Sequence, residues 1–456
     1  MKIITVAEVV SATEGELICG NVETQISAVS TDSRKLEPGS LFVPLVGENF
    51  DGHDFIAKAL EGGAAAVLTA KDTKPGTCPV IRVDDTLRAL QKLAAYCRSL
   101  FPIPAVALTG SVGKTTTKEM VAAVLESKFN TLKTEGNFNN EIGLPLTVFR
   151  LEERHEIAVV EMGMSGFGEI DRLAKIIKPD TAILTNIGMS HIELLGSQEN
   201  IYRAKSEILA HTKPNGTVLL NGDDPILWKH RLEISQNTIS AGVENTDCDV
   251  LASQVDSRVD SISFHFSGLG HEMDITLHIP GEHNVYNALF ACVCGILYGV
   301  PDDGIISALA EFRPTNMRMD ILEHNGLRII NDCYNAAPAS MQAALKVLGA
   351  YPGRRVAVLG DIVCLGDYAY GAHREVGSAV CRCGIDELIT VGENARYIAE
   401  GAFENGMDSA AIHSFETVTE LLQKLGGLVR GGDTVLIKAS RAMKLERVTE
   451  FLINLV

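Results

Sequence analysis

The sequence predicts an α/β protein of three domains in which parallel-rich sheets are covered by helices. The chain has 456 residues, which is too many for one hydrophobic core. Its composition, with 46% hydrophobic residues, 5% aromatic residues and 41 glycines, is typical of α/β layers. Short apolar runs alternate with helical stretches, most regularly in the last third. We expect domains at residues 1–102, 103–312 and 313–456.

The N-terminal domain is expected to be a small α/β unit. The apolar runs 41–45 and 64–68 predict two strands, with an Ala-rich helix ahead of the second. A polar cluster before the Pro38-Gly39 turn could hold a polar ligand or could simply be a capped turn. Its members are Ser30, Asp32, Ser33 and Arg34.

Residues 105–126 are the most informative stretch of the chain. The run 105–108 predicts a buried strand, and 118–126 predicts a helix. The turn between them allows backbone N–H groups to converge on phosphate oxygens, while Lys114 adds a mobile charge and the Thr115 hydroxyl can bind Mg²⁺. The residues concerned are Gly110, Ser111, Gly113, Lys114, Thr115 and Thr116. We predict a nucleoside triphosphate site in a central P-loop domain; the alternative is a glycine-rich turn without a ligand.

Two further strands are expected to end near this turn. The apolar run 157–161 ends in a carboxylate, so Glu161 is a candidate Mg²⁺ ligand, directly or through water. The run 181–185 leads toward His191. A metal or phosphate role and an ordinary loop position both fit this histidine.

Asparagine is concentrated in two stretches. Asn137, Asn139 and Asn140 supply more amides than a turn requires, and amides orient a ligand without adding charge. Asn284 and Asn287 lie three positions apart at the start of a predicted helix, so both could contact one base or phosphate. Asn284 could instead be the N-cap of that helix.

The last third is expected to be a Rossmann-like, doubly wound domain. Strands at 328–331, 355–359, 387–391 and 433–437 alternate with helical stretches near 340–350, 372–383, 394–405 and 415–425. Ligand residues are expected at strand ends. Those residues are Asp332, Tyr334, Asn335, Lys438, Ser440 and Arg441, of which Arg441 could bind a carboxylate through two hydrogen bonds.

Charge and hydropathy exclude several classes of partner. The chain has 40 Lys+Arg against 58 Asp+Glu, a net charge of −18, which argues against nucleic-acid binding and a membrane-surface role. A charge comes too early for a signal-peptide core, and no apolar run approaches transmembrane length. We expect a cytoplasmic protein without membrane insertion.

Six motifs lie at 109–119, 135–140, 186–191, 204–208, 281–287 and 318–319. Together they resemble the Mur ligases, ATP-dependent enzymes that form amide bonds in peptidoglycan precursor synthesis, and the resemblance covers the whole chain. Within that family, segments 115–119, 137–140, 331–341 and 438–443 are similar to the member that joins D-alanyl-D-alanine to UDP-N-acetylmuramoyl-tripeptide. The chain departs from that member's usual pattern at Ala337, Ala339, Cys364 and Ala439.

The resemblance implies a monomer that uses ATP and two Mg²⁺ ions to convert a carboxylate into an acyl phosphate, which an amine then attacks. It implies catalytic roles for Lys114, Glu161, His191 and Lys205, with Thr115, Glu161, His191 and a carbamylated Lys205 at the metals. Besides the phosphate turn, it implies that ATP contacts Asn284, Asn287, Arg318 and Asp332. It assigns the UDP-substrate to Ser30, Asp32, Ser33, Arg34, Asn137, Asn139 and Asn140, and the acceptor to Tyr334, Asn335, Lys438, Ser440 and Arg441.

Other interpretations remain open on the sequence. Without the resemblance, Lys205 would be a solvated helix residue paired with Glu199 or Glu207. A tripeptide-forming Mur ligase, a folylpolyglutamate synthase, and a P-loop switch or binding protein without ligase chemistry are the alternatives. Phosphate release that depends on an amino acceptor would separate a ligase from a switch.

Overall fold

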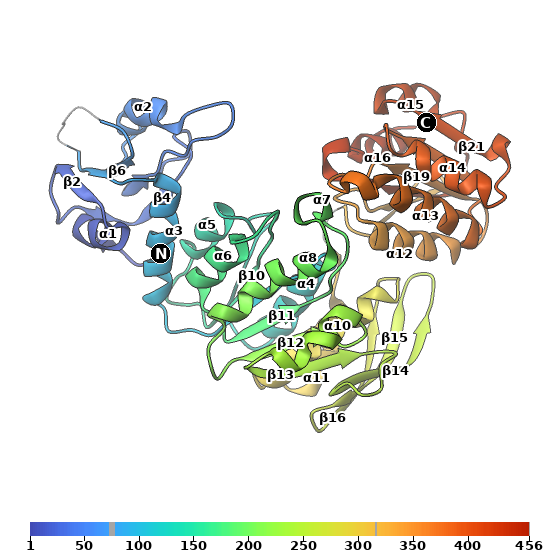
Figure 1. The fold of residues 1–456 in the computed structure, drawn as a ribbon, viewed down its shortest axis with the longest axis horizontal. Helices are drawn as coiled ribbons and strands as arrows, with labels where there is room; N and C mark the ends of the chain where they lie inside the picture. The colour runs from blue at the N-terminus through green and yellow to red at the C-terminus, as the bar shows by residue number, and fades with distance from the viewer. Residues whose placement is uncertain (73–77, 315–316, 456) are drawn as a thin grey trace.

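The computed structural model describes residues 1–72, 78–314 and 317–455, and its sheets fall into three groups along the chain (Figure 1). Five- and two-stranded sheets come first, a nine-stranded sheet follows, and a six-stranded sheet ends the chain. The predicted three-part α/β fold is confirmed. The expected domain ranges also contain residues 73–77, 315–316 and 456, which lie outside the described residues.

The N-terminal unit has a mixed five-stranded sheet of order β2-β7-β6-β5-β4 and a small β1-β3 pair. The strands are β1 (Ile4–Thr5), β2 (Glu16–Cys19), β3 (Gln25–Ile26), β4 (Ala28–Ser30), β5 (Ser40–Phe42), β6 (Ala66–Thr69) and β7 (Val80–Arg82). The helices are α1 (Val6–Thr13), η1 (Gly52–Phe55), α2 (Ile56–Glu61) and α3 (Thr86–Ser99). Both predicted strands exist, as β5 and β6. Helix α3 buries an apolar stripe and reaches the next unit, where Gln91 Nε2 donates to the Glu141 carbonyl at 3.3 Å.

The central unit is a nine-stranded sheet of order β16-β15-β14-β13-β12-β11-β8-β10-β9. The strands are β8 (Ala105–Thr109), β9 (Thr131–Lys133), β10 (Ile157–Glu161), β11 (Thr181–Leu184), β12 (Thr217–Asn221), β13 (Asn237–Gly242), β14 (Val250–Ser257), β15 (Ile262–Gly268) and β16 (His271–Leu277). Neighbours from β9 to β14 are parallel, whereas β14, β15 and β16 form an antiparallel meander. Strands β8, β10 and β11 match predicted strands, whereas the meander was not predicted.

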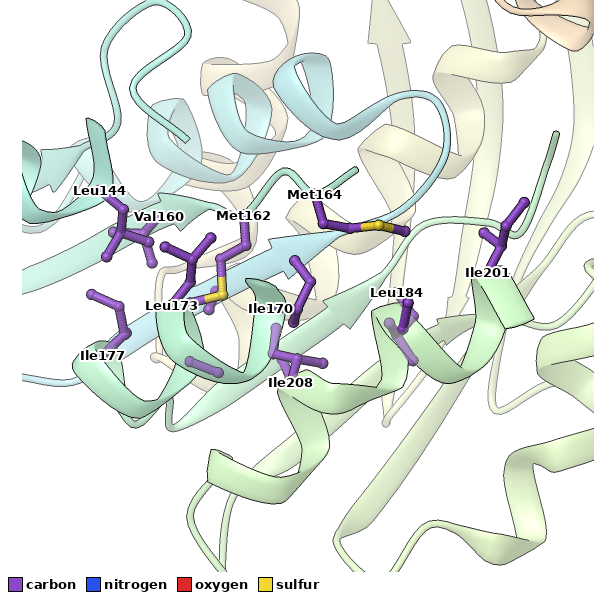
Figure 2. Close-up of a cluster of buried hydrophobic side chains, with 14 of the residues drawn as sticks. Leu144, Val160, Met162, Met164, Ile170, Leu173, Ile177, Leu184, Ile201 and Ile208 are labelled. Atoms are coloured by element: carbon purple, nitrogen blue, oxygen red, sulfur yellow. The ribbon is translucent and has the colours of Figure 1, made fainter. Parts of the chain in front are cut away.

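Helices cover both faces of this sheet. They are α4 (Lys114–Glu126), α5 (Gly143–Val148), α6 (Glu169–Ile177), α7 (Ile192–Leu195), α8 (Gln198–Ser206), η2 (Glu207–His211), α9 (Pro225–His230), η3 (Arg231–Glu233), α10 (His283–Leu297) and α11 (Asp302–Glu311). Side chains alternate along a strand. Val159 therefore packs in the cluster of α4 and α10, whereas Val160 packs in the opposite cluster with Ile170 and Leu173 of α6 and Ile201 of α8 (Figure 2).

The C-terminal unit is a doubly wound sheet of order β17-β18-β22-β19-β20-β21, parallel except for β17 against β18. The strands are β17 (Asp320–His324), β18 (Leu327–Asn331), β19 (Arg355–Gly360), β20 (Glu387–Val391), β21 (Ile412–Phe415) and β22 (Thr434–Lys438). The helices are α12 (Pro338–Gly349), η4 (Gly366–Tyr368), α13 (Ala369–Arg382), α14 (Arg396–Glu404), η5 (Ser409–Ala411), α15 (Val418–Leu425), η6 (Arg441–Met443) and α16 (Glu446–Ile453). All four predicted strands and helices are present; β17 and β21 were not predicted.

The central and C-terminal units touch where α7 reaches toward η4 (Figure 1). The Glu193 backbone N–H donates to the Cys364 carbonyl at 3.4 Å, and the Tyr368 hydroxyl donates to the Gly196 carbonyl at 3.3 Å. Within the described residues, no helix combines the length and apolarity needed to span a bilayer.

Candidate active site

The predicted phosphate turn lies between β8 and α4. Gly113 precedes the helix at φ +82° and provides no side-chain cap, so the first N–H groups of α4 lack intrahelical partners. With the helix dipole, these donors favour an anion. Helix α4 begins at Lys114, four residues before the predicted start. The Lys114 ammonium folds back on the turn and donates to the carbonyls of Gly110 at 2.9 Å and Ser111 at 3.3 Å.

Asn186 fixes the shape of this turn. Its side chain accepts from Val112 N at 2.9 Å and donates to the Val112 carbonyl at 3.1 Å, and its own carbonyl accepts from Ser111 N at 3.0 Å. Thr185 Oγ1 adds a bond to the Val112 carbonyl at 2.7 Å. The end of β11 therefore holds the turn in place. No separate role was predicted for Asn186. Its position directly after a strand that was expected to end near the turn could have indicated one.

Glu161 lies at the end of β10 with its side chain buried against the start of α4. Its Oε2 accepts from Thr115 Oγ1 at 2.8 Å and its Oε1 accepts from Asn139 Nδ2 at 2.7 Å. Its backbone N–H donates to Thr134 Oγ1 at 3.1 Å. The carboxylate thus has neutral hydrogen-bond partners in a buried place. A buried anion favours a cation partner, and hydroxyl and carboxylate oxygens are the ligands that Mg²⁺ prefers.

A cavity of about 380 Å³ lies beside the turn, and residues of both the central and the C-terminal units line it. The central unit contributes Ser111, Gly113, Lys114, Thr115, Thr116, Asn139, Glu161, Ser190, Asn221, Tyr286, Asn284 and Asn287. The C-terminal side contributes Arg318, Asp332, Tyr334, Asn335, Ala337, Ala339, Ser340 and Lys438. A volume of this size accommodates a small polar ligand.

The two asparagines of α10 share a face, as predicted. Asn287 Nδ2 donates to Asn284 Oδ1 at 3.0 Å, and Asn287 Oδ1 accepts from Thr117 Oγ1 at 2.8 Å. The alternative interpretation of Asn284 as an N-cap is wrong, because α10 is preceded by Glu282 and Asn284 lies inside the helix. Its Nδ2 donates instead to the Pro280 carbonyl at 2.8 Å. The pair ties α10 to the start of α4.

Lys205 approaches the turn from α8. Its side chain is 2% exposed, and its Nζ donates to the Gly110 carbonyl at 2.8 Å. The alternative of a solvated pair with Glu199 or Glu207 is wrong, because Glu199 faces Lys229 and His230 while Glu207 accepts from backbone N–H groups. Burial, reinforced by the charge of Lys114, lowers the pKa of Lys205 well below its usual value.

His191 directly precedes α7, with φ +64°. Burial lowers its pKa to about 4, and the charges of Lys205 and Lys114 act in the same direction. The imidazole is therefore neutral at neutral pH, the form that binds metals. Neither His191 nor Lys205 lines the cavity. In the part of the chain that the structure describes, no three His, Cys, Asp or Glu side chains gather as a metal site.

The C-terminal wall is organised around Asp332, just after β18. Its Oδ2 accepts from Lys438 Nζ at 2.5 Å, and its Oδ1 accepts from Met319 N at 3.2 Å. The Arg318 guanidinium lies 4.2 Å from the centroid of the Tyr334 ring. Residues from two strand ends and from the segment that joins the units therefore meet at one edge.

Comparison with known proteins gives the same outline along the whole chain. Family models match at residues 25–98 (Mur ligase family, catalytic domain), 108–295 (Mur ligase middle domain) and 317–441 (Mur ligase, glutamate ligase domain). The UDP-N-acetylmuramoyl-tripeptide–D-alanyl-D-alanine ligase of Bacillus subtilis is 41% identical over 99% of this chain and 98% of its own. The chain belongs to the Mur ligase family.

Other relatives agree. The Escherichia coli enzyme of the same description is 35% identical, with 98% of each chain covered. A crystal structure of MurF from Acinetobacter baumannii superposes with a TM-score of 0.93 at 32% identity, covering 100% of this chain and 99% of that one. MurF from Thermotoga maritima in complex with ADP has a TM-score of 0.84 at 31% identity, with 94% and 97% covered.

In this Mur ligase, the residues predicted to bind ATP lie together. All of them except Gly110 line the cavity, and Gly110 contacts Lys114 and Lys205 through its carbonyl. Tyr286, which also lines the cavity, was missed; its hydroxyl donates to Asp223 Oδ2 at 2.7 Å. A lone tyrosine inside a helix gives no sequence signal for such a position.

The residues predicted to bind the UDP-substrate do not lie together. Asn139 lines the cavity and contacts Glu161, whereas Asn137 is exposed and Asn140 Oδ1 accepts from two backbone N–H groups ahead of α5. The cluster of Ser30, Asp32, Ser33 and Arg34 lies apart from the cavity. There the Asp32 carboxylate accepts two 2.9 Å bonds from the Arg34 guanidinium and one from its backbone, as the capped-turn alternative expects.

The residues predicted to bind the acceptor are divided. Tyr334, Asn335 and Lys438 line the cavity. Ser440 does not; its Oγ accepts from Val363 N at 3.0 Å. Arg441 is exposed and pairs with Glu446 at 3.1 Å, also outside the cavity lining.

Proposed function

We propose that this protein joins D-alanyl-D-alanine to UDP-N-acetylmuramoyl-tripeptide at the expense of ATP. The observation that carries the proposal is the Thr115–Glu161 pair at the start of α4, inside a cavity that both units line. The full-length relatives named above add the substrate identities. Of the alternatives, a switch protein would not need a second wall of strand-end residues from a doubly wound unit.

The reaction divides into two balanced steps. The terminal carboxylate of the peptide takes the γ-phosphoryl group of ATP, which gives an acyl phosphate and ADP. The dipeptide amine then attacks the acyl carbon, phosphate leaves with the C–O electron pair, and the amine loses a proton. Positioning and charge neutralisation supply most of the catalysis in such a transfer.

The chain's own residues can provide that neutralisation. The N–H groups at the start of α4 bind phosphate oxygens. The Lys114 ammonium exchanges its hydrogen bonds to the turn carbonyls for contacts with the β- and γ-phosphates. Arg318 adds a second positive charge from the C-terminal side. Asn284 and Asn287 orient the nucleotide without adding charge. Asp332 holds Lys438 and the backbone beside Arg318.

Mg²⁺ fits the oxygen ligands present at the turn. Thr115 and Glu161 would hold one ion, because the buried carboxylate accepts its hydrogen bonds from neutral groups and the ion would place a positive charge directly against it. His191, which is neutral, and a carbamate on Lys205 would serve a second. Lys205 has the required property, a buried amine whose partner among the described residues is the Gly110 carbonyl and not a carboxylate. When bound, the ions would neutralise charge on the phosphates.

We propose that each domain binds one substrate: residues 1–102 bind the UDP-substrate, residues 103–312 bind ATP and residues 313–456 bind the acceptor. Ser30, Asp32, Ser33, Arg34, Asn137, Asn139 and Asn140 stay candidates for the first role, and Asn335, Lys438, Ser440 and Arg441 for the last. We propose a monomer that acts in the cytoplasm, where both ATP and the nucleotide-linked precursor are available, without a nucleic-acid partner.

One assay tests the proposal. Purified protein with ATP and Mg²⁺ is given UDP-N-acetylmuramoyl-tripeptide, and phosphate release is followed with D-alanyl-D-alanine, L-lysine, diaminopimelate or glutamate as acceptor. We expect release with the dipeptide and a product whose mass has increased by the dipeptide minus water. No release with any acceptor would instead favour a tripeptide-forming ligase or a folylpolyglutamate synthase, because neither uses a precursor that already carries three peptide residues. Release without any acceptor would indicate a switch.

A further inference from the structure

The Arg318 side chain rests on an aromatic ring of its own unit. Its guanidinium carbon lies 4.2 Å from the centroid of the Tyr334 ring, and both residues line the cavity. A cation within about 6 Å of a ring centroid is attracted by the electrons of the ring face. The contact therefore limits where the guanidinium can point.

The backbone around Arg318 is held by the same short segment after β18. Met317 and Met319, on either side of Arg318, have φ values of +62° and +50°, a left-handed conformation that non-glycine residues keep only when their surroundings fix it. Tyr334 N donates to the Met317 carbonyl at 3.1 Å, and Met319 N donates to Asp332 Oδ1 at 3.2 Å. Arg318 is thus attached on both sides to the C-terminal unit.

The charge of Arg318 acts on the phosphate turn. Burial lowers the pKa of Lys114 and the charge of Arg318 lowers it further, whereas Glu161 acts in the opposite direction. Lys114 and Arg318 line the same cavity. A second guanidinium, that of Arg441, lies 6.0 Å from the Tyr334 centroid but is paired with Glu446. Of the two arginines near this ring, Arg318 is the one that lines the cavity.

We propose that Tyr334 is a positioning residue for Arg318. The ring and the backbone N–H of Tyr334 hold the Arg318 guanidinium toward the phosphate end of the cavity. This inference rests on the proposed function, and it gives Tyr334 a different role from the acceptor contact expected from the sequence.

The test compares Tyr334→Leu, which removes the ring, with Tyr334→Phe, which keeps it. Tyr370→Leu is the matched control, since the Arg374 guanidinium lies 5.0 Å from the Tyr370 centroid on α13, outside the cavity lining. We expect Tyr334→Leu to lower kcat about tenfold with the KM for the dipeptide unchanged. Tyr370→Leu should stay within about twofold of the wild type, and Tyr334→Phe, which keeps the ring, should retain most of the activity that Tyr334→Leu loses. A loss in Tyr334→Phe equal to that in Tyr334→Leu, or a raised dipeptide KM, would overturn the proposal.

A double-mutant cycle with Arg318→Ala shows whether Tyr334 acts through Arg318. If it does, Arg318→Ala/Tyr334→Leu is no slower than Arg318→Ala alone; additive losses would contradict the inference. Affinity for a non-hydrolysable ATP analogue, measured by calorimetry with Mg²⁺, repeats the cycle without any ligation. If the two substitutions have non-additive effects on the affinity for the analogue but the protein does not ligate the dipeptide, the proposed function is refuted and the role of Tyr334 is supported. If the protein ligates the dipeptide but the two effects are additive, the proposed function is supported and the role of Tyr334 is refuted.

Discussion

The hydroxyl of Thr115 donates a 2.8 Å hydrogen bond to the carboxylate of Glu161, across 46 positions of sequence. The two meet because β8 and β10 are adjacent parallel strands, with Glu161 beside Leu108 in register, so that both strands end at one edge. Helix α4 starts at that edge. A hydroxyl and a buried carboxylate thus lie at a helix start that favours anions, which is the arrangement that a metal-bound triphosphate requires.

Replacing Thr115 tests this relationship. Thr115→Val keeps the shape but loses the oxygen, so we expect the Mg²⁺ concentration for half-maximal activity to rise at least about tenfold. Thr115→Ser keeps the oxygen and should behave like the wild type. Magnesium titrations of the phosphate-release rate measure both variants. Identical magnesium dependence in the two variants would show that the hydroxyl does not serve the metal.

Glu161→Gln separates catalysis from stability. The amide keeps the shape and can still accept from Asn139, but it removes a buried charge whose hydrogen-bond partners are neutral. We expect activity to fall at least about tenfold, because the ligand that we propose for Mg²⁺ is lost. Without Mg²⁺, thermal unfolding should occur at the same or a higher temperature, because burying an amide costs less than burying a charge. A clear loss of thermal stability together with full activity would argue for a purely structural glutamate.

Much of this site could be predicted because local chemistry determines it. The glycines, the lysine and the hydroxyls between a strand and a helix predict the phosphate turn from Gly110 to Thr116. The acid at the end of β10 follows from strand order in a parallel sheet. For Lys205, the sequence pattern alone predicted a solvated residue, because burial against the Gly110 carbonyl depends on the packing of α8. Only the family resemblance suggested its role.

The rest depended on tertiary contacts that no short pattern contains. The hold of Asn186 on Val112 requires β11 to lie next to β8. Asn139 donates to Glu161 and does not lie in a separate amide-rich site. This contact depends on the path of the chain after β9. Strands β15 and β16 alternate buried and more exposed residues on either side of the turn at Gly268 and Gly270, a hairpin signal that was overlooked in an otherwise parallel sheet.

Gly113→Ala should be more harmful than an alanine at another glycine with similar backbone. A Cβ at Gly113 would lie 3.0 Å from Asn287 Oδ1, whereas one at Gly406, where φ is +97°, would meet nothing within 4 Å. Each change carries the cost of a left-handed alanine, about 1 kcal/mol. We expect both variants to unfold at a lower temperature but only Gly113→Ala to lose affinity for the ATP analogue. Equal nucleotide affinities would mean that the turn tolerates a side chain there.

His191 should make stability depend on pH. Its pKa falls from 6.5 to about 4 in the folded protein, so between these values the unfolded chain binds more protons. The free energy of unfolding therefore decreases as the pH is lowered from about 6.5 to about 4. His191→Asn removes this contribution. Denaturant unfolding of both proteins across that range should show a shallower decrease for the variant; parallel curves would contradict the shifted pKa.

Lys205 offers the sharpest test, because the chain contains a second buried lysine for comparison. Lys118 is also fully buried, but its Nζ lies 2.6 Å from Glu119 in an ion pair that needs the ammonium form. Lys205 donates to a carbonyl, and its lowered pKa leaves more free amine at neutral pH. Carbamate formation needs that free amine. Carbon-13 NMR after labelling with bicarbonate should therefore show a carbamate that disappears in Lys205→Arg and persists in Lys118→Arg.

Activity should follow the same distinction. Lys205→Ala removes the group that would carry the carbamate, so we expect ligation to fall at least about tenfold. Short carboxylates such as acetate should restore part of it, because they return a negative oxygen to the space left by the side chain. A purely structural lysine would show neither the labelled carbon nor the rescue. Full activity in Lys205→Ala would remove Lys205 from the proposed metal sites and leave Thr115, Glu161 and His191 as the candidate protein ligands.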